Sequence, residues 1–227
     1  MKLSIAKSEL QRGLARLQAI VEKRNTMPIL ANVLLSASKS PKPGFLEIAA
    51  TDLEVGIRGI HPADVEAAGA ITASAKKLYE IIREIEDPQV VVQTEDETRV
   101  RVESGASRFT LLAISPAEYP TIASGDGVAF VEIEAPLLST MISRTLYATS
   151  TDETRYNLNG VFAEAVDGGR LRLVATDGHR LTKIDRSLAS TVPFLTKGII
   201  IPRKGVAEIQ KLCDETDGSI EIGLSPD

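Results

Sequence analysis

The chain has 227 residues, of which 43% are hydrophobic and 25% are charged, a composition typical of a folded chain with one large domain or two ordinary ones. The only cysteine, Cys213, excludes an internal disulfide and a cysteine-based zinc cluster, and agrees with a cytoplasmic protein. The formal net charge of −5 argues by itself against a nucleic-acid partner. The sequence has no apolar run of about 18 residues, so no membrane span is predicted. The N-terminus lacks the continuous apolar segment of a secretory signal.

The first part of the chain reads as a short alternating strand from Leu3 followed by an amphipathic helix over residues 8–24. Leu10, Leu14 and Leu17 recur at helical spacing, and Ser8 suits the N-cap. A second helix is predicted over residues 74–86, before the alternating strand residues of 89–104. Strands with two interleaved helices, without regular strand–helix alternation, favour an α+β domain: an antiparallel sheet with both helices on one face.

The same order of elements returns in the second part of the chain, at a nearly constant offset of about 127 residues. Matching positions are Ile5 and Ile133, Asn32 and Asn159, Thr51 and Thr176, and Lys77 and Lys204. The tripeptide Ala-Thr-Asp occurs at both 50–52 and 175–177. Two further helices are therefore predicted, over residues 135–147 and 203–212. The chain is a tandem repeat of one α+β unit.

The small, polar and glycine-rich segment 121–128 places the boundary between the two repeats. We therefore expect domains at 1–124 and 128–227. In the first repeat, the strand near residue 90 is followed by the segment 97–121, which supplies two more strands. The second repeat has no counterpart for them, so we expect it to be incomplete at its C-terminal end.

The charge is unevenly distributed, because the four predicted helices together are positive although the chain as a whole is acidic. If the helices share one side of the sheets, that side is a basic surface that DNA phosphates can bind without regard to sequence. Helix position selects Arg12, Arg16, Lys76, Lys77 and Arg144 as candidate phosphate contacts. The alternative is that these side chains form the ordinary solvated faces of amphipathic helices.

Catalytic motifs are absent from the sequence. There is no Gly-x-Ser-x-Gly elbow, phosphate-binding Gly-rich loop or His-Glu-x-x-His pattern. If the stretch around them is a strand, Asp177 and His179 share one face and could touch, but such a pair is more often structural or part of a binding surface. Cys213 follows Val206 and Ile209 on an apolar stripe, which favours a core position. We expect no enzymatic activity, metal or cofactor.

Several motifs, in order along the whole chain, resemble the bacterial DNA polymerase III beta subunit, or beta sliding clamp. They are Lys-Arg-Asn-Thr-Met-Pro-Ile-Leu-Ala-Asn at 23–32, Ala-Thr-Asp at 50–52, Arg-Phe at 108–109, Glu-Tyr-Pro at 118–120, Arg-Tyr-Asn-Leu-Asn-Gly at 155–160, Ala-Thr-Asp-Gly-His-Arg-Leu at 175–181 and Ile-Pro-Arg-Lys-Gly at 201–205. The combination of Thr-Asp-Gly-His-Arg-Leu with Pro-Arg-Lys-Gly is specific, whereas Glu-Tyr-Pro alone is not.

The resemblance implies a role as a polymerase processivity factor. Family members have three similar domains per chain and form a homodimeric ring around duplex DNA, with helices lining the hole. On this basis the third clamp domain is expected to be absent from this chain. The implied partners are double-stranded DNA, the polymerase III alpha subunit, the clamp loader and other proteins with clamp-binding motifs. A sequence-nonspecific DNA-binding module without a ring is the alternative.

The resemblance also implies three sets of site residues. Arg24, Arg203, Lys204 and Tyr156 are expected near DNA. The second-domain wall of a partner-peptide cleft is expected to contain Arg155, Leu158, Thr176, Gly178, His179, Arg180 and Leu181. The first-domain edge that closes the ring is expected to contain Arg99, Arg101 and Arg108.

Overall fold

The computed structural model describes residues 1–21, 27–123, 125 and 127–225. The chain divides into two compact units, Met1–Ala123 and Ser124–Asp227. Each unit has its own hydrophobic core, one built around Leu10, Ile48 and Leu78 and the other around Leu138, Val161 and Leu173. Each unit combines antiparallel strands with two helices, which confirms the predicted α+β class.

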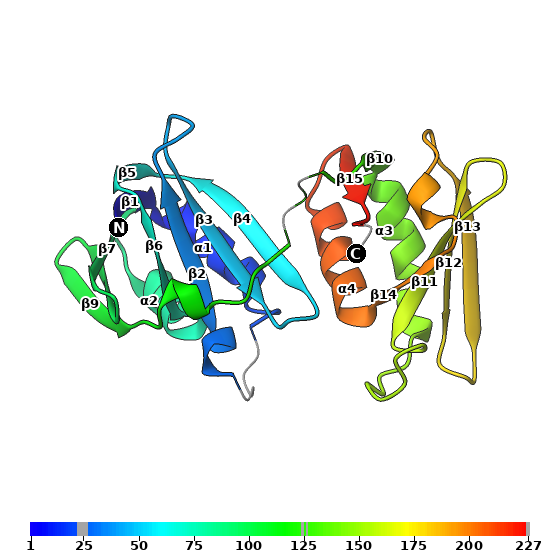
Figure 1. The fold of residues 1–227 in the computed structure, drawn as a ribbon, viewed down its shortest axis with the longest axis horizontal. Helices are drawn as coiled ribbons and strands as arrows, with labels where there is room; N and C mark the ends of the chain where they lie inside the picture. Colours follow the sequence, from blue (N-terminus) through cyan, green and yellow to red (C-terminus); the bar gives the residue numbers. More distant parts are fainter. Residues whose placement is uncertain (22–26, 124, 126, 226–227) are drawn as a thin grey trace. The chain divides into compact units, whose positions relative to one another are not determined.

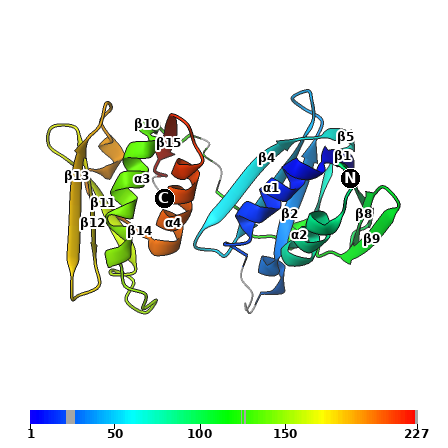
Figure 2. The same ribbon diagram turned by 180° about the vertical axis from the view of Figure 1, so that it is seen from behind.

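The first unit begins with β1 (Lys2–Ala6) and α1 (Lys7–Leu17), followed by β2 (Asn32–Ser38), β3 (Phe45–Thr51), β4 (Gly56–Pro62), β5 (Asp64–Ala67) and β6 (Gly69–Ser74). After α2 (Ala75–Glu84) come β7 (Gln89–Asp96), β8 (Arg99–Ser104) and β9 (Ser107–Leu112). The strands form two antiparallel sheets, in the orders β5-β1-β7-β8-β9 and β4-β3-β2-β6. The single sheet predicted for this unit is therefore two sheets, with α1 and α2 side by side against them (Figures 1 and 2).

The second unit repeats the plan with β10 (Phe130–Glu134), α3 (Ala135–Ser143), β11 (Gly160–Val166), β12 (Arg170–Thr176), β13 (Leu181–Ser187), β14 (Ile199–Pro202), α4 (Arg203–Asp214) and β15 (Ser219–Gly223). β10 pairs with β15, and the other strands form an antiparallel sheet in the order β13-β12-β11-β14. Figure 1 shows α3 and α4 packed side by side on one face of that sheet. Cys213 is buried beside Val206 in this core, as predicted.

The structure corrects the predicted first helix at both ends. α1 begins at Lys7, so the predicted cap Ser8 lies within the first turn, and the preceding residue Ala6 makes no side-chain cap. The helix ends at Leu17 rather than at 24, because the amide of Ile20 turns back to the Leu17 carbonyl (3.0 Å) and the Ile20 side chain is fully buried. Apolar residues continue at helical spacing through this turn, so periodicity alone overestimates the length of the helix.

Short 3-10 helices connect several elements: η1 (Pro28–Ala31), η2 (Pro116–Glu118), η3 (Leu146–Ala148) and η4 (Pro193–Leu195). The Glu-Tyr-Pro motif begins at the last residue of η2, and the hydroxyl of its Tyr119 donates to the Asn32 carbonyl (3.1 Å). Tyr119 is buried with Ile29 and Leu30. The motif therefore anchors the segment after β9 onto the start of β2. No helix within the described residues is both long enough and apolar enough to cross a membrane.

His61 is a buried side chain that depends on two glycines. Its ring lies between α1 and β4, where a Cβ added at Gly13 would be 2.5 Å from Nε2 and one at Gly59 would be 2.9 Å from it. The His61 Nδ1 atom lies 3.3 Å from a Glu9 carboxylate oxygen. Glycine at these two positions lets α1 approach the sheet closely enough to cover the imidazole.

We expect Gly13→Ala to lower the free energy of unfolding by about 1–2 kcal/mol. Overpacking costs about 1–3 kcal/mol, and the contacts of 2.5 Å to His61 and 2.8 Å to Ile48 place this site in the upper part of that range, at about 2–3 kcal/mol. This cost exceeds the gain of about 1 kcal/mol from replacing a helical glycine. Urea unfolding followed by circular dichroism measures the change. Ser8→Ala on the same helix is the control, and should stay within about 0.5 kcal/mol of the parent. An unchanged or more stable Gly13→Ala variant would show that the imidazole can move away.

Candidate functional site

The Ala-Thr-Asp repeat forms the same turn in both units. In the second unit the Thr176 hydroxyl donates to the Arg180 carbonyl (2.7 Å) and accepts from the Gly178 amide (3.1 Å). In the first, Thr51 makes the equivalent bonds to the Val55 carbonyl and the Leu53 amide, each 3.0 Å long. The sequence repeat is thus a repeat of side-chain hydrogen bonds that close the β3–β4 and β12–β13 connections.

Asp177 holds the turn of the second unit in place. One carboxylate oxygen accepts from the amides of His179 and Arg180, both at 3.0 Å, and the other accepts from Arg180 Nε at 3.0 Å. The hydrogen bonds from these two backbone amides are the main reason that the pKa of Asp177 is lowered to about 2, and the Arg180 guanidinium adds to the effect. Asp177 and His179 therefore do not share one face of a strand, because residues 177–180 form a tight turn.

The structure brings the predicted cleft residues together at this turn. Gly178 has a φ of +92°, and a Cβ added there would lie 3.9 Å from Nη1 of Arg155. The amide of Leu158 donates to the Arg155 carbonyl (2.8 Å), so Leu158 belongs to the same region. Leu181 begins β13 with 65% of its surface exposed. These residues form a surface with apolar and polar parts and an open glycine backbone.

The predicted DNA-contact positions of the second unit lie at the same end as this turn. The amide of Arg203, the first residue of α4, donates to the Asn159 carbonyl (3.1 Å), three residues after Tyr156. Tyr156 is 83% exposed. Arg144 caps the C-terminal end of α3 and is exposed, Arg203 is exposed, and Lys204 is half-buried. Neither Arg144 nor Arg203 forms an ion pair with another residue in the part of the chain that the structure describes.

On the helices of the first unit, Arg12, Arg16, Lys76 and Lys77 are exposed, as the amphipathic pattern predicts. Two of them have acidic neighbours: Arg12 contacts both carboxylate oxygens of Glu9 at 2.6 Å, and Lys76 lies 3.8 Å from Glu80. Such exposed pairs contribute little to stability, but they lower the local positive charge. Arg24 lies outside the described residues.

The residues predicted for a ring edge lie on two different strands. Arg99 and Arg101 are on β8, which lies between β7 and β9 and is therefore an inner strand of its sheet. The Arg101 guanidinium donates to Gln93 Oε1 (3.1 Å) and to Glu95 Oε1 (3.2 Å) on the neighbouring strand β7. Arg108 is on β9, the edge strand.

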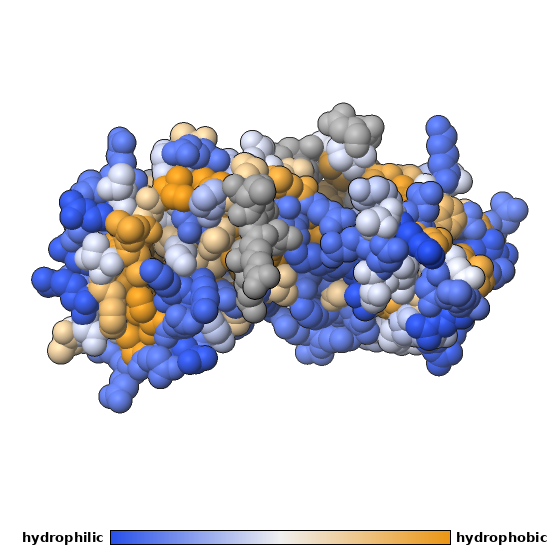
Figure 3. Space-filling model, turned by 90° about the horizontal axis from the view of Figure 1, so that it is seen from below, coloured by the Kyte–Doolittle hydropathy of each residue, from blue (hydrophilic) through white to orange (hydrophobic). Residues whose placement is uncertain are grey.

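β9 also exposes apolar side chains that the sequence-based selection missed. Phe109 is 37% exposed and Leu112 is 80% exposed. Figure 3 shows apolar side chains gathered on the end of the first unit that contains this strand. An edge strand with exposed apolar side chains can pair with another strand. The signal available in the sequence was the Arg-Phe motif at 108–109.

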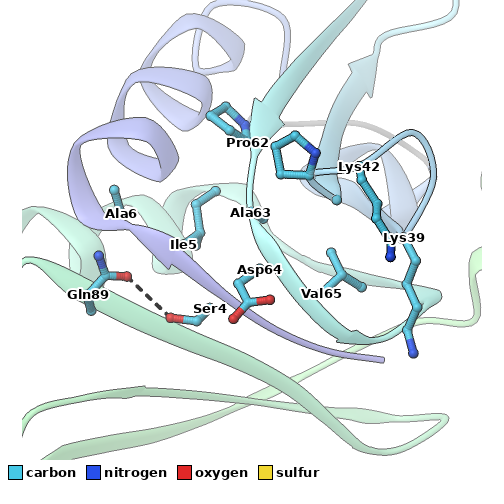
Figure 4. Close-up of a pocket in the computed structure, with 12 residues that line it drawn as sticks. Ser4, Ile5, Ala6, Lys39, Lys42, Pro62, Ala63, Asp64, Val65 and Gln89 are labelled. Atoms are coloured by element: carbon cyan, nitrogen blue, oxygen red, sulfur yellow. Dashed lines mark hydrogen bonds between the residues drawn. The ribbon is translucent and has the colours of Figure 1, made fainter.

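The first unit also has a pocket that contains no predicted site residue (Figure 4). It lies between β1, β5 and the loop before β3, and is lined by Ser4, Ile5, Ala6, Lys39, Lys42, Pro43, Gly44, Pro62, Ala63, Asp64, Val65 and Gln89. The Ser4 hydroxyl donates to Gln89 Oε1 (3.3 Å) across its floor. Among the described residues, no group of three or more His, Cys, Asp and Glu side chains could hold a metal ion.

Comparison with known proteins decides the family. The model for the DNA polymerase III beta subunit, N-terminal domain, matches residues 1–123, and that for the central domain of the same subunit matches residues 132–227. The chain belongs to the DNA polymerase III beta subunit family. The resemblance inferred from the motifs is therefore confirmed.

Relatives in this family match the chain over nearly its whole length. The beta sliding clamps of Caulobacter vibrioides and Pseudomonas aeruginosa are each 36% identical to it, over 100% and 99% of this chain and 61% and 60% of their own length. The solved structure of Caulobacter crescentus pol III beta has a TM-score of 0.91 at 37% identity, covering 100% of this chain and 61% of that one. The sliding clamp of Bartonella birtlesii bound to griselimycin has a TM-score of 0.89 at 38% identity, covering 99% and 60%. The chain thus spans about three-fifths of the length of these beta subunit relatives.

The low pKa of Asp177 leads to a prediction. Because its folded-state pKa of about 2 lies below the ordinary 3.8, the turn is stabilised above about pH 4 and loses that contribution as pH falls from about 4 to about 2. A carboxyl carbon NMR titration should place the Asp177 midpoint near 2. Arg180→Ala leaves both hydrogen bonds from the backbone amides to Asp177, so it should move the midpoint upward only slightly. A parent midpoint near 3.8 would contradict the hydrogen-bonding scheme.

Proposed function

We propose that the chain is the DNA-encircling part of a sliding clamp, a processivity factor that tethers replicative polymerase to duplex DNA. Membership of the beta subunit family carries this proposal, and the exposed basic residues of the helices support it. On this proposal 1–124 and 128–227 are the first and second clamp domains, and a third domain of the family plan would complete the ring. The role is mechanical rather than catalytic, and we place it in the cytoplasm with the replication machinery.

The proposed DNA-facing surface consists of helix side chains and one loop. It includes Arg12, Arg16, Lys76, Lys77, Arg144, Arg203, Lys204 and Tyr156, with Arg24 carried over from the family motif. The support is that the described members are exposed or half-buried in a protein whose net charge is −5. Phosphate contacts of this kind do not read sequence, so the surface would let DNA slide.

The proposed partner-peptide site is the turn region of the second unit: Arg155, Leu158, Thr176, Gly178, His179, Arg180 and Leu181. Exposed Leu181 supplies apolar contact, and Gly178 leaves room for a peptide backbone to approach. We propose as partners the polymerase alpha subunit, the clamp loader and other proteins with short clamp-binding motifs. The Bartonella birtlesii clamp, a relative in this family, binds griselimycin.

For ring closure as a homodimer, we propose β9 as the first-domain edge, with Arg108 supplying polar contacts beside Phe109 and Leu112. The unpaired edge of β9 and its exposed apolar side chains support strand pairing with another chain. Arg99 and Arg101 stay in the proposal as neighbours of this edge rather than as part of it.

A topological assay separates the clamp from a simple DNA-binding module. We would extend the chain with the remaining C-terminal residues of the Caulobacter vibrioides beta sliding clamp and load it onto nicked circular DNA with a clamp loader. Cutting the circle should release the protein, because a ring slides off free ends. A module with 6–10 phosphate contacts would remain equally on both forms and lose roughly 10³–10⁵-fold in affinity between 50 and 200 mM salt. That result would refute the ring.

We further propose that griselimycin, to which the Bartonella birtlesii clamp is bound, occupies this peptide site, so that it can be used to test the site in this chain. We expect a titration to shift the backbone amide NMR signals of Leu158 and of residues 176–181. The equivalent turn at residues 51–55 of the first unit has the same hydrogen bonds but Leu53 in place of Gly178, so it is an internal control and should not respond. Shifts at both turns would indicate nonspecific binding, and no shift at millimolar griselimycin would contradict the proposed site.

A further inference from the structure

Arg180, one of the two arginines of the proposed peptide site, is held by a residue outside it. Its Nη2 atom donates to the Tyr147 carbonyl (2.7 Å), and its guanidinium carbon lies 5.3 Å from the centre of the Tyr147 ring. Stacking on an aromatic face and a charge-assisted hydrogen bond both orient a guanidinium. With the Asp177 carboxylate on the other side, Arg180 is fixed at both ends of its planar group.

Tyr147 is itself anchored, although 55% of its surface is exposed. Its hydroxyl is hydrogen-bonded to the Thr182 hydroxyl on β13, 2.8 Å away. Its backbone belongs to η3, which follows the fully buried Thr145. The Thr145 hydroxyl donates to the Met141 carbonyl of α3, and the Thr145 carbonyl accepts from the Ala148 amide. The ring therefore has a fixed position from which to hold Arg180.

The surroundings of the ring leave these contacts as its main restraints. Tyr147 borders a hollow between the end of α3 and β13, together with Ser143, Arg144, Thr182 and Arg186. On this open side the ring is restrained by the hydrogen bond of its hydroxyl to Thr182 and by the Arg180 guanidinium stacked on it.

We infer that Tyr147 is a positioning residue for the partner-peptide site, which holds Arg180 in one conformation before a ligand arrives. This inference rests on the proposed peptide site. An arginine that is already ordered loses less conformational entropy when it contacts a peptide, so preorganisation raises affinity. The same contacts connect the peptide site to the end of α3, which carries Arg144.

The test compares griselimycin affinity of the 227-residue chain and its variants by NMR titration. Tyr147→Leu should weaken binding about three- to tenfold, because it removes the stacking face and the hydroxyl but leaves the backbone carbonyl. Tyr147→Phe keeps the stacking face and should recover most of the loss. Tyr79→Leu, which removes a half-buried tyrosine from the first unit, is the matched control and should bind as the parent does.

A second measurement needs no ligand. In the parent, the Arg180 Nε–H proton should be protected from exchange with solvent, and Tyr147→Leu should reduce that protection while Tyr79→Leu does not. Parent-like affinity and protection in Tyr147→Leu would overturn the inference and leave the peptide site standing. Failure of the parent to bind griselimycin would count against the peptide site, and the exchange data would still decide whether Tyr147 orders Arg180.

Discussion

Each unit depends on one constraint, that a pair of amphipathic helices can bury only one apolar stripe per helix against its sheets. In α1 the stripe contains Leu10, Leu14 and Leu17, which are at most 1% exposed. Their burial turns Arg12 and Arg16 to solvent. The same geometry in α2 buries Leu78 and Ile82 and exposes Lys76 and Lys77. The basic surface proposed to face DNA is thus a direct consequence of core formation, and needs no separate folding device.

The opposite faces of the sheets have different chemistry. Arg172 binds both oxygens of Asp185 on β13 at 2.9 Å and also Glu164 on β11. Its guanidinium is the main reason that the pKa of Asp185 is lowered. Arg101 is similarly surrounded by acidic and amide groups on the first unit. Arginines on these faces are neutralised across the strands, whereas Arg144 and Arg203 at helix ends have no ion-pair partner among the described residues. Arginine content alone would not distinguish the two groups.

The same turn occurs in both units, but the two copies differ in one position. Thr51 and Thr176 make equivalent hydrogen bonds, and both turns require a left-handed residue after the aspartate. In the second unit this residue is Gly178, whereas in the first it is Leu53 with a φ of +79°. A leucine side chain there fills the space through which a ligand backbone would approach. The shared turn is structural, and the proposed binding site of the second unit depends on the glycine.

The sequence by itself determined the tandem α+β units, their helices, the family and the clustering of Thr176–Leu181 with Arg155, because periodicity and motifs are local properties of the chain. It overestimated the first helix, since apolar spacing does not distinguish Ile20 in a buried turn from a helical residue. The tertiary structure alone decided that the strands of each unit form two sheets, that β9 rather than β8 is the edge, and that Tyr147 holds Arg180. Strand order and contacts between residues 33 positions apart arise from long-range pairing and packing, which no local pattern encodes.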